Sequence, residues 1–452
     1  MKRLLLVLAF LAAATTSRAA DITPAAVERL VQPFVQQRWL MGAVVAVVDG
    51  DRVTVRGFGR RSGQDGRAPD ADTRFEIASV SKTLAALVTA DSGVDLDTPL
   101  ARYLPSTVHV PSKDGQVITL RQLAQHRSGL PKIPKLVSQV PGDPYHGYTE
   151  QLMLDGLADI ELDAAPGARY SYSNLGVALL GKVVADRAGK PYPALVAEKI
   201  FRPLGMSASS FGADATVVPG HDAELEPTPF WSFGPFNPAG GVISTAADLG
   251  RYVAACLDPQ SPIAPALRRC QEHTAPAYAG AEVGLAWHHD LATGVWFHDG
   301  ASGGFRSLVA FHPASRRGLV FLANATCYPL TKDLDAPHNL VTGLLELVVN
   351  GSTRVTPPPV FTLAPAALAL HAGEYALDAD PSFHARVTGE DDHLVIAFGD
   401  IFRQRLYSTG AHVFVERTLA TQTTFDAPAG AVTGVTYLLE GSPMHFTRVA
   451  TP

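Results

Sequence analysis

A serine and a lysine lie three residues apart at Ser79 and Lys82, within the segment Phe75-Glu-Ile-Ala-Ser-Val-Ser-Lys-Thr. On a helix, residues at this spacing share a face with Cβ atoms about 5–6 Å apart, so the lysine amine can reach the serine hydroxyl. A serine hydroxyl is a weak nucleophile until a base takes its proton, and a partly neutral lysine can help to do so. No other lysine in the chain has a serine three residues before it. The pair predicts nucleophilic catalysis by Ser79.

A second segment whose side chains could take part in catalysis is Tyr170-Ser-Tyr172-Ser-Asn174, which leads into an apolar helical run at 175–180. A phenol at Tyr172 can relay a proton to a leaving group if it lies beside the Ser79–Lys82 pair. Asn174 would donate to a substrate carbonyl and orient Lys82. The same residues also fit a helix cap with packed tyrosines, and the segment alone does not separate the two interpretations.

The third segment is Trp296-Phe-His298-Asp-Gly300-Ala301, a strand that ends in small residues. Such an edge lets a substrate backbone lie alongside it, with His298 near the acidic or carbonyl end of the substrate. A glycine-rich turn between two strands has the same composition, so this segment is also ambiguous by itself.

The elements that must position these segments are helices and antiparallel strands. Thr23-Pro24 places a capping hydroxyl before proline at the first helical position and predicts a helix there. Two β-rich runs around Asp49-Gly50 predict a hairpin over residues 42–55. These two elements would begin a sheet that carries helices on its faces.

The rest of this region alternates between helical and β-rich stretches. Residues 79–260 are rich in helical patterns and Pro/Gly loops, and residues 283–324 are again β-rich. A final amphipathic helix runs through 340–348 and ends at Gly351. The order predicts an antiparallel sheet built from both ends of the region, with a mostly helical block between them.

The C-terminal part has a different pattern. Residues 352–368 contain consecutive prolines and predict an extended linker after a first domain at 21–351. Residues 369–452 alternate between β-rich runs and Gly/Pro turns, which predicts a small barrel-like β domain.

Three motifs in order resemble the active-site boxes of the serine β-lactamase and DD-peptidase superfamily: Ser79-Val-Ser-Lys82, Tyr172-Ser-Asn174 and His298-Asp-Gly300. The resemblance is closest to the class C branch, because the second box is Tyr-x-Asn. Flanking stretches at 119–131, 202–206 and 239–248 are similar too, and the resemblance covers about 21–350. It implies an α+β fold with an antiparallel sheet flanked by helices and an all-helical subdomain. The C-terminal β unit resembles the lipocalin-like extensions of some such hydrolases.

The resemblance also implies roles for the residues of the boxes. Ser79 would be the nucleophile, Lys82 and Tyr172 would handle the proton, and the backbone amides of Ser79 and Ala301 would form an oxyanion hole. The substrate contacts would be Asn174, His298 and Gly300. Either Lys82 or Tyr172 can be the acylation base, and no metal or cofactor is expected.

The sequence departs from the family pattern in two places. His298 stands where the class C β-lactamases carry lysine, and a neutral imidazole pairs less well with a substrate carboxylate. Related esterases and peptidases carry histidine or tryptophan there. The stretch from Lys82 to Asp97 is about four residues short, which is near one helical turn and would keep the buried face in phase.

Composition limits the partners and the compartment. The 452-residue chain has a formal net charge of −6, which argues against a nucleic-acid partner. Residues 1–20 have the pattern of a signal peptide with cleavage near Ala19 or Ala20, so we expect a periplasmic or secreted protein whose mature form has no membrane span. Cys256 and Cys270 could pair, or they could remain buried free thiols together with Cys327.

These observations predict an exported serine hydrolase that cleaves amide or ester bonds through an acyl-enzyme on Ser79. The expected substrate is a small molecule or peptide, with a peptidoglycan-derived D-amino-acid peptide first and small esters next, as for a DD-carboxypeptidase-type peptidase or an esterase. A true class C-like β-lactamase is an alternative. An alternative from another class is a penicillin-recognising binding or sensor protein with little turnover.

Overall fold

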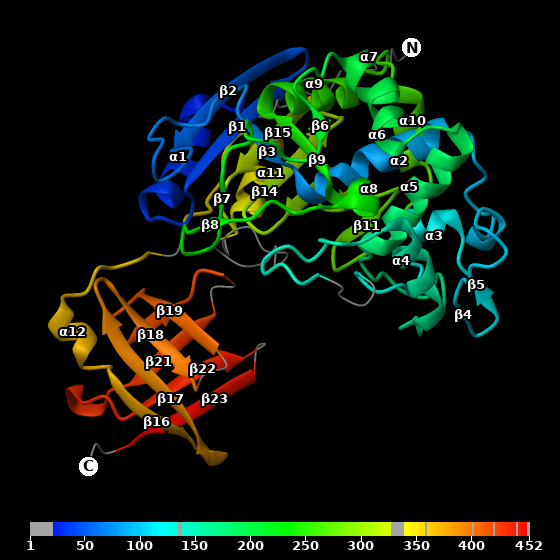
Figure 1. Ribbon diagram of the computed structural model, residues 1–452. Coiled ribbons are helices and arrows are strands. Elements are labelled where there is room, and N and C mark those ends of the chain that lie inside the picture. Colours follow the sequence, from blue (N-terminus) through cyan, green and yellow to red (C-terminus); the bar gives the residue numbers. More distant parts are fainter. Residues whose placement is uncertain are drawn as a thin grey trace, which may run out of the picture.

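The computed structural model describes residues 21–133, 138–326, 339–357, 359–399, 402–418, 421–439 and 442–449. A sheet flanked by helices occupies about the first three quarters of the chain, and a closed β-barrel follows it (Figure 1). The expected signal peptide at 1–20 lies outside the described residues.

An antiparallel sheet of eight strands is the frame of the larger unit, with the order β10-β11-β12-β13-β14-β15-β1-β2. Its first and last strands in the chain are neighbours, because β1 pairs with β15 from Ala43↔Ala323 to Asp49↔Arg317. The strands are β1 (Gly42–Asp49), β2 (Arg52–Gly59), β10 (Ala275–Pro276), β11 (Ala281–Val283), β12 (His288–Asp290), β13 (Trp296–Ala301), β14 (Arg306–His312) and β15 (Arg317–Ala323).

Helices cover both faces of this sheet, and β1 shows why. Val44, Ala46 and Val48 pack into one hydrophobic cluster, whereas the alternate residues of the strand pack into another. Since successive strand side chains point to opposite faces, an all-apolar strand needs cover on both sides. One face carries α1 (Pro24–Gln36) and α11 (Leu340–Asn350), and the other carries α2 (Ser81–Asp91) and α9 (Ala246–Leu257).

The helical subdomain packs on the far side of α2, which runs between the sheet and this subdomain (Figure 1). Every residue of α2 from Ser81 to Ala90 is buried, so the helix is a shared core element. The helices of the subdomain and its surroundings are α3 (Leu120–Ala124), α4 (Glu150–Asp155), α5 (Asn174–Ala188), α6 (Tyr192–Val196), α7 (Arg202–Leu204), α8 (Asn237–Gly240) and α10 (Ala264–Gln271). Short strands complete it: β3 (Arg74–Glu76), β4 (Ser112–Lys113), β5 (Gln116–Val117), β6 (Ser210–Phe211), β7 (Gly220–His221), β8 (Pro227–Thr228) and β9 (Val242–Thr245).

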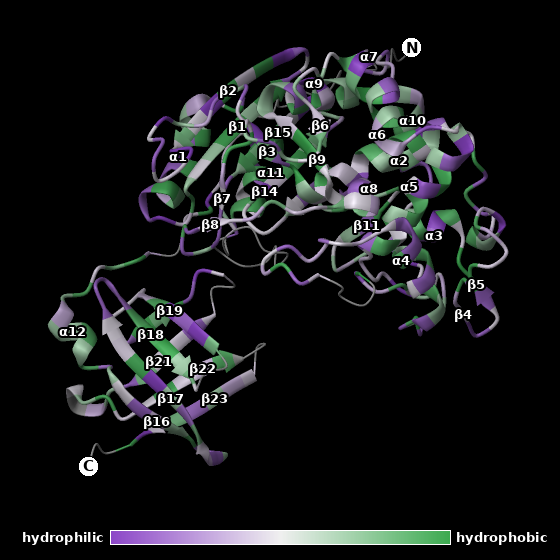
Figure 2. Ribbon diagram, viewed as in Figure 1, coloured by the Kyte–Doolittle hydropathy of each residue, from purple (hydrophilic) through white to green (hydrophobic). Residues whose placement is uncertain are grey.

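The C-terminal unit is a closed barrel of β16 (Gly373–Leu377), β17 (Asp380–Glu390), β18 (His393–Phe398), β19 (Phe402–Ser408), β20 (Val413–Val415), β21 (Gln422–Asp426), β22 (Gly434–Leu439) and β23 (Ser442–Arg448). Hydrophobic and hydrophilic residues alternate along its strands (Figure 2). At the end of the predicted Pro-rich linker, 352–368, the structure has the short helix α12 (Pro365–Ala369). Proline at its first positions favours a helix start, and Leu368 packs into the barrel core.

The barrel contacts the larger unit through a small number of polar and apolar groups. Glu224, between β7 and β8, accepts a hydrogen bond from the Tyr407 hydroxyl and pairs with Arg405 at 3.4 Å. The buried guanidinium of Arg417 lies 3.6 Å from the centroid of the Tyr407 ring. Val415 joins the hydrophobic cluster formed by α1 and α11.

Two further expectations concern cysteines and membranes. Cys256 and Cys270 are free thiols, so the disulfide considered for them is not formed, and Cys327 lies outside the described residues. Among the described residues, none of the helices has the length and apolarity needed to cross a membrane.

Candidate active site

Ser79 lies in a 3₁₀ turn (Ala78–Val80) between β3 and α2, where its side chain remains half-buried. We expected the serine on the helix itself, and the structure places it directly before the first turn of α2, which carries Lys82. Ala78 has a φ of +44°, a left-handed conformation that is unfavourable for a residue with a side chain. Backbone strain of this kind clusters at functional sites, where the surrounding structure maintains it.

Lys82 is fully buried and is held by two oxygen atoms. Its Nζ atom donates to Ser79 Oγ at 2.9 Å and to the backbone oxygen of Ala239 at 2.6 Å. The same atom lies 4.9 Å from the centroid of the Tyr172 ring. An amine, a hydroxyl and a phenol ring from α2, the preceding turn and the segment before α5 therefore meet in one place.

Tyr172 precedes α5, whose N-terminus is capped by Ser173 through a hydrogen bond from Gly176 N to Ser173 Oγ at 2.9 Å. Burial raises the pKa of Tyr172 well above 10, while a hydrogen bond with Ser79 acts in the opposite direction. The phenol is therefore protonated at neutral pH and can donate a proton.

Asn174 is the first residue of α5 and is almost fully buried. Its Nδ2 atom donates to the Tyr145 hydroxyl at 2.6 Å, so this tyrosine fixes the direction of the amide. The Oδ1 atom has no hydrogen-bond partner in the described part of the chain. We predicted that Asn174 orients Lys82, whereas the hydrogen bond that orients the Asn174 amide is the one to Tyr145.

The third segment lies on β13, with a free edge where it meets the site. Pairing with β12 covers Trp296 and Phe297, and residues 298–301 continue beyond that pairing. Gly300 packs against the nucleophile, since a Cβ atom there would lie 3.0 Å from Ser79 N. The pairing of the Ala301 amide with the Ser79 amide in an oxyanion hole stays a prediction.

His298 is 1% exposed, and burial lowers its pKa well below 6.5, with His288 and Lys82 acting in the same direction. The ring is therefore neutral at pH 7. Its Nδ1 atom lies 2.6 Å from the backbone oxygen of Asp299, which can only accept, so Nδ1 carries the proton. Nε2 is then an acceptor, and it has no hydrogen-bond partner among the described residues. His298 offers a lone pair rather than a positive charge.

A histidine that no sequence signal identified packs against the Tyr172 ring. His126 is fully buried, and its ring lies 4.3 Å from the Tyr172 ring between centroids. Its backbone oxygen accepts from Ser171 N at 2.7 Å and its Nδ1 from Ser173 N at 3.2 Å, with a φ of +56°. The stretch 119–131 had been noted as similar to the family, but nothing in its composition gave His126 this place.

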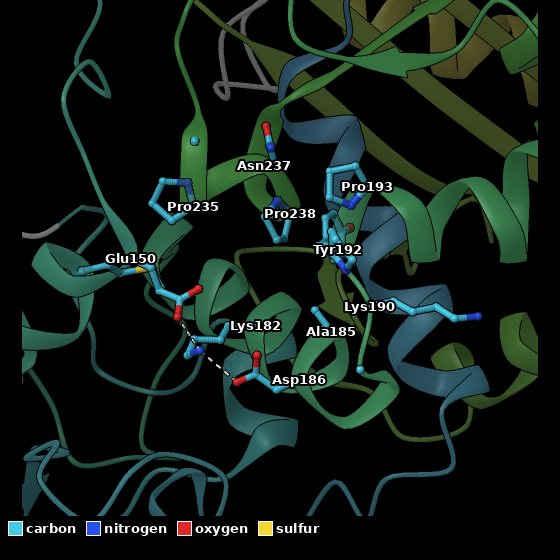
Figure 3. A pocket seen from close by; sticks show the side chains of 14 residues that line it. Glu150, Lys182, Ala185, Asp186, Lys190, Tyr192, Pro193, Pro235, Asn237 and Pro238 are labelled. Carbon is cyan, nitrogen blue, oxygen red and sulfur yellow. Dashed lines mark hydrogen bonds and ion pairs between the residues drawn. The ribbon is translucent and has the colours of Figure 1, made fainter.

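A separate cavity of about 620 Å³ lies at the other end of α5 (Figure 3). Lys182 points between Glu150 and Asp186 there, at 2.6 and 2.8 Å. Its lining contains none of Ser79, Lys82 and Tyr172. Among the residues that the structure describes, no group of three or more His, Cys, Asp or Glu side chains is arranged to hold a metal ion.

Comparison with known proteins gives the arrangement a context. The family model described as Beta-lactamase matches residues 27–342. AmpH of Escherichia coli strain K12, named a D-alanyl-D-alanine-carboxypeptidase/endopeptidase, is 33% identical over 228 residues, covering 47% of this chain and 56% of that protein. Penicillin-binding protein 4 of Amycolatopsis lactamdurans is 29% identical over 314 residues, covering 63% of this chain and 80% of that protein. The match therefore spans little more than half the length of AmpH.

A solved structure supports the same assignment. The β-lactamase/D-alanine carboxypeptidase from Yersinia pestis superposes with a TM-score of 0.59 at 25% identity, covering 67% of this chain and 92% of that chain. Together with the closed C-terminal barrel, this likeness confirms the expected fold class. The resemblance to the serine β-lactamase and DD-peptidase superfamily is confirmed as well.

Proposed function

The chain belongs to the β-lactamase family, and on that premise we propose that it is a serine hydrolase that forms an acyl-enzyme on Ser79. The observation that carries the proposal is the bond from Lys82 Nζ to Ser79 Oγ at 2.9 Å, with the Tyr172 ring beside it. A serine hydroxyl becomes an activated nucleophile when an adjacent group, here the neutral form of the amine or the phenol acting as a relay, takes up its proton.

In the proposed reaction, Ser79 Oγ forms a bond to the substrate carbonyl carbon. Its proton passes either to Lys82 in the neutral amine form, or to Tyr172 as the phenol passes its own proton onward. The carbonyl oxygen becomes an oxyanion that the backbone amides of Ser79 and Ala301 stabilise. When the intermediate collapses, the bond to the amine or alcohol breaks and that group takes the proton. Water then attacks the ester on Ser79 by the same route, which releases the acid and restores the serine.

The substrate that we favour is a D-amino-acid peptide of the cell-wall type. The names of AmpH and of the Yersinia pestis enzyme, both D-alanine carboxypeptidases, support this class. Neutral His298 in place of lysine weakens the attraction for a substrate carboxylate, so small esters are the second class and β-lactams the third. A signal peptide at 1–20, cleaved near Ala19 or Ala20, would direct the enzyme to the periplasm or the exterior, where such peptides occur.

The experiment is a substrate panel on the purified protein and its Ser79→Ala variant, with a D-Ala-D-Ala peptide, a short-chain ester, a chromogenic cephalosporin and a fluorescent penicillin. Turnover of one member that disappears in Ser79→Ala is the expected result. A stable penicillin label on Ser79 without turnover of any member would instead identify a sensor. Undiminished turnover in Ser79→Ala would contradict the proposal.

A further inference from the structure

Glu76 is a buried carboxyl group at the end of β3, three residues before the nucleophile, and it is 2% exposed. Its Oε2 atom accepts from the Ser302 hydroxyl at 2.6 Å, and its Oε1 atom accepts from the backbone nitrogen of Trp231 at 2.9 Å. One side chain therefore joins three segments that are far apart in the sequence.

The first of these links holds the two sides of the oxyanion site together. Ser302 directly follows Ala301, and its hydroxyl reaches back to the strand that leads to Ser79. A second hydroxyl, that of Ser307 on β14, donates to the backbone oxygen of Ile77 at 2.6 Å. The Ser302 hydroxyl thus fastens β3 to the residue after Ala301. The Ser307 hydroxyl fastens Ile77, next to the strained Ala78, to β14, which pairs with β13.

The second link holds the Trp231 segment against the end of β3. Trp231 Nε1 donates to the backbone oxygen of Gly142 at 2.7 Å, and a Cβ atom on Gly303 would lie 2.8 Å from the same Nε1 atom. A cavity of about 740 Å³, lined in part by Glu76 and Trp231, adjoins this segment. Because a cavity lies on one side of the Trp231 segment, fewer packing contacts hold that segment, and its position depends more on the hydrogen bond to Glu76.

Ionisation of this carboxyl group is disfavoured by its surroundings. Burial raises the pKa of Glu76 to about 7, and the negative field of Asp143 adds to the rise, while Ser302 and Trp231 oppose it. Within the described part of the chain, Glu76 forms no ion pair with a cation. The carboxyl group is buried although its ionisation is unfavourable, and it accepts hydrogen bonds from Ser302 and Trp231. These features fit a role in positioning those two segments.

We propose that Glu76 is a positioning residue, whose carboxylate fastens Ser302 and Trp231 so that the amides of Ser79 and Ala301 keep their places across the oxyanion site. This inference rests on the proposed acyl-enzyme function. Glutamine at position 76 would keep one acceptor oxygen and replace the other by an NH₂ donor. Since Ser302 and Trp231 both donate to this side chain, glutamine could accept only one of the two hydrogen bonds with the same geometry.

The test compares wild type with Glu76→Gln, Glu76→Ala, Ser302→Ala and the double variant Glu76→Gln/Ser302→Ala. The matched control is Glu346→Gln on α11, because Glu346 likewise accepts a hydrogen bond from a hydroxyl group, that of Thr353, at 2.6 Å. Acylation of Ser79 by a fluorescent penicillin or by the best ester of the panel is timed from pH 5 to 9. Hydrogen exchange of the amides at 299–304 and 230–232 is measured in parallel, and it does not depend on the reaction.

We expect acylation to slow by about 10- to 100-fold in Glu76→Gln and Ser302→Ala, with the double variant no slower than either one alone. The wild-type rate should fall as Glu76 is protonated below a midpoint near pH 7, and Glu76→Gln should lack that step. Exchange at 299–304 should rise in the variants and stay unchanged in Glu346→Gln.

Two failures are distinguishable. If wild type is not acylated by any probe, the acyl-enzyme proposal fails, and hydrogen exchange still decides whether Glu76 fastens the loops. If exchange and acylation in Glu76→Gln and Ser302→Ala match wild type, the positioning role is wrong. Should Glu76→Ala fail to fold, Glu76→Gln and Ser302→Ala alone give the answer.

Discussion

Gly300 packs so closely against the turn of Ser79 that a Cβ atom on it would lie 3.0 Å from Ser79 N. The same atom would lie 2.5 Å from the backbone oxygen of Ile77 and 2.2 Å from Ser307 Oγ. The end of β13 and the turn of Ser79 can approach this closely only because Gly300, at the point of contact, has no side chain. The space in which an oxyanion would be held depends on that approach.

Gly300→Ala should therefore separate Ser79 N from Ala301 N. We expect kcat/KM to fall by about 10²–10³-fold, as when one oxyanion donor is lost. Gly66→Ala is the control, because nothing lies within 4 Å of a Cβ atom there. Steady-state kinetics on the best substrate of the panel measures both, and full activity in Gly300→Ala would contradict the assigned geometry.

Lys82→Gln should remove the amine that touches Ser79 Oγ while keeping a polar side chain of similar length. We expect the acylation rate to fall by at least about 10³-fold, since residues that act as one unit each carry most of the effect. Lys182→Gln, on the distant face of α5, is the matched control. Mass spectrometry of the acyl-enzyme after rapid mixing provides the rate. A loss smaller than tenfold would exclude Lys82 as a proton handler.

Tyr172→Phe should remove the hydroxyl and leave the ring contacts with His126 and Lys82 in place. Because burial raises the pKa of Tyr172 well above 10, its role at neutral pH is to donate or relay a proton. We expect a loss of about 10²–10⁴-fold in kcat. The loss should be smaller for substrates with a good leaving group, which need less protonation. Equal losses for good and poor leaving groups would argue against a relay to the leaving group.

His298→Lys should restore a positive charge at the edge of β13. Because burial lowers the pKa of His298 well below 6.5, its ring is uncharged at neutral pH in wild type. We expect the variant to raise kcat/KM for a peptide with a free carboxylate by about tenfold relative to a neutral ester. The ratio of the two substrates is the readout, and a ratio equal to that of wild type would show that His298 does not face the carboxylate.

His445 makes barrel stability dependent on pH. It lies between Asp426 and Asp378, at 2.8 and 2.7 Å, and these hydrogen bonds raise its pKa above 6.5. A raised folded-state pKa stabilises the fold fully below the unfolded value, and this contribution is lost as pH rises through the folded value. His445→Gln should thus lower the thermal midpoint at pH 5.5, with the difference shrinking by pH 9. Exposed His384→Gln is the control, and a pH-independent difference would contradict this account.

The sequence determined the elements whose signals are local. Thr23-Pro24 begins α1, Asp49-Gly50 turns the β1–β2 hairpin, and Gly351 ends α11 with a φ of +68°. These signals work because capping and turn geometry involve residues within one or two turns of each other. Helix α12, at the end of the predicted linker, was not expected from the sequence, and packing of Leu368 on the barrel core accompanies it.

The spacing of Ser79 and Lys82 likewise identified a pair that one helical turn brings into contact. Only the tertiary structure decided which groups surround that pair, because each comes from a distant segment. It set the neutral state of His298 through burial, placed His126 behind Tyr172, and directed Asn174 toward Tyr145. It also gave Glu76 its two donors, although a glutamate in a short strand would ordinarily point to solvent. Burial and long-range contact change the chemistry of a side chain, and neither can be read from its neighbours in the chain.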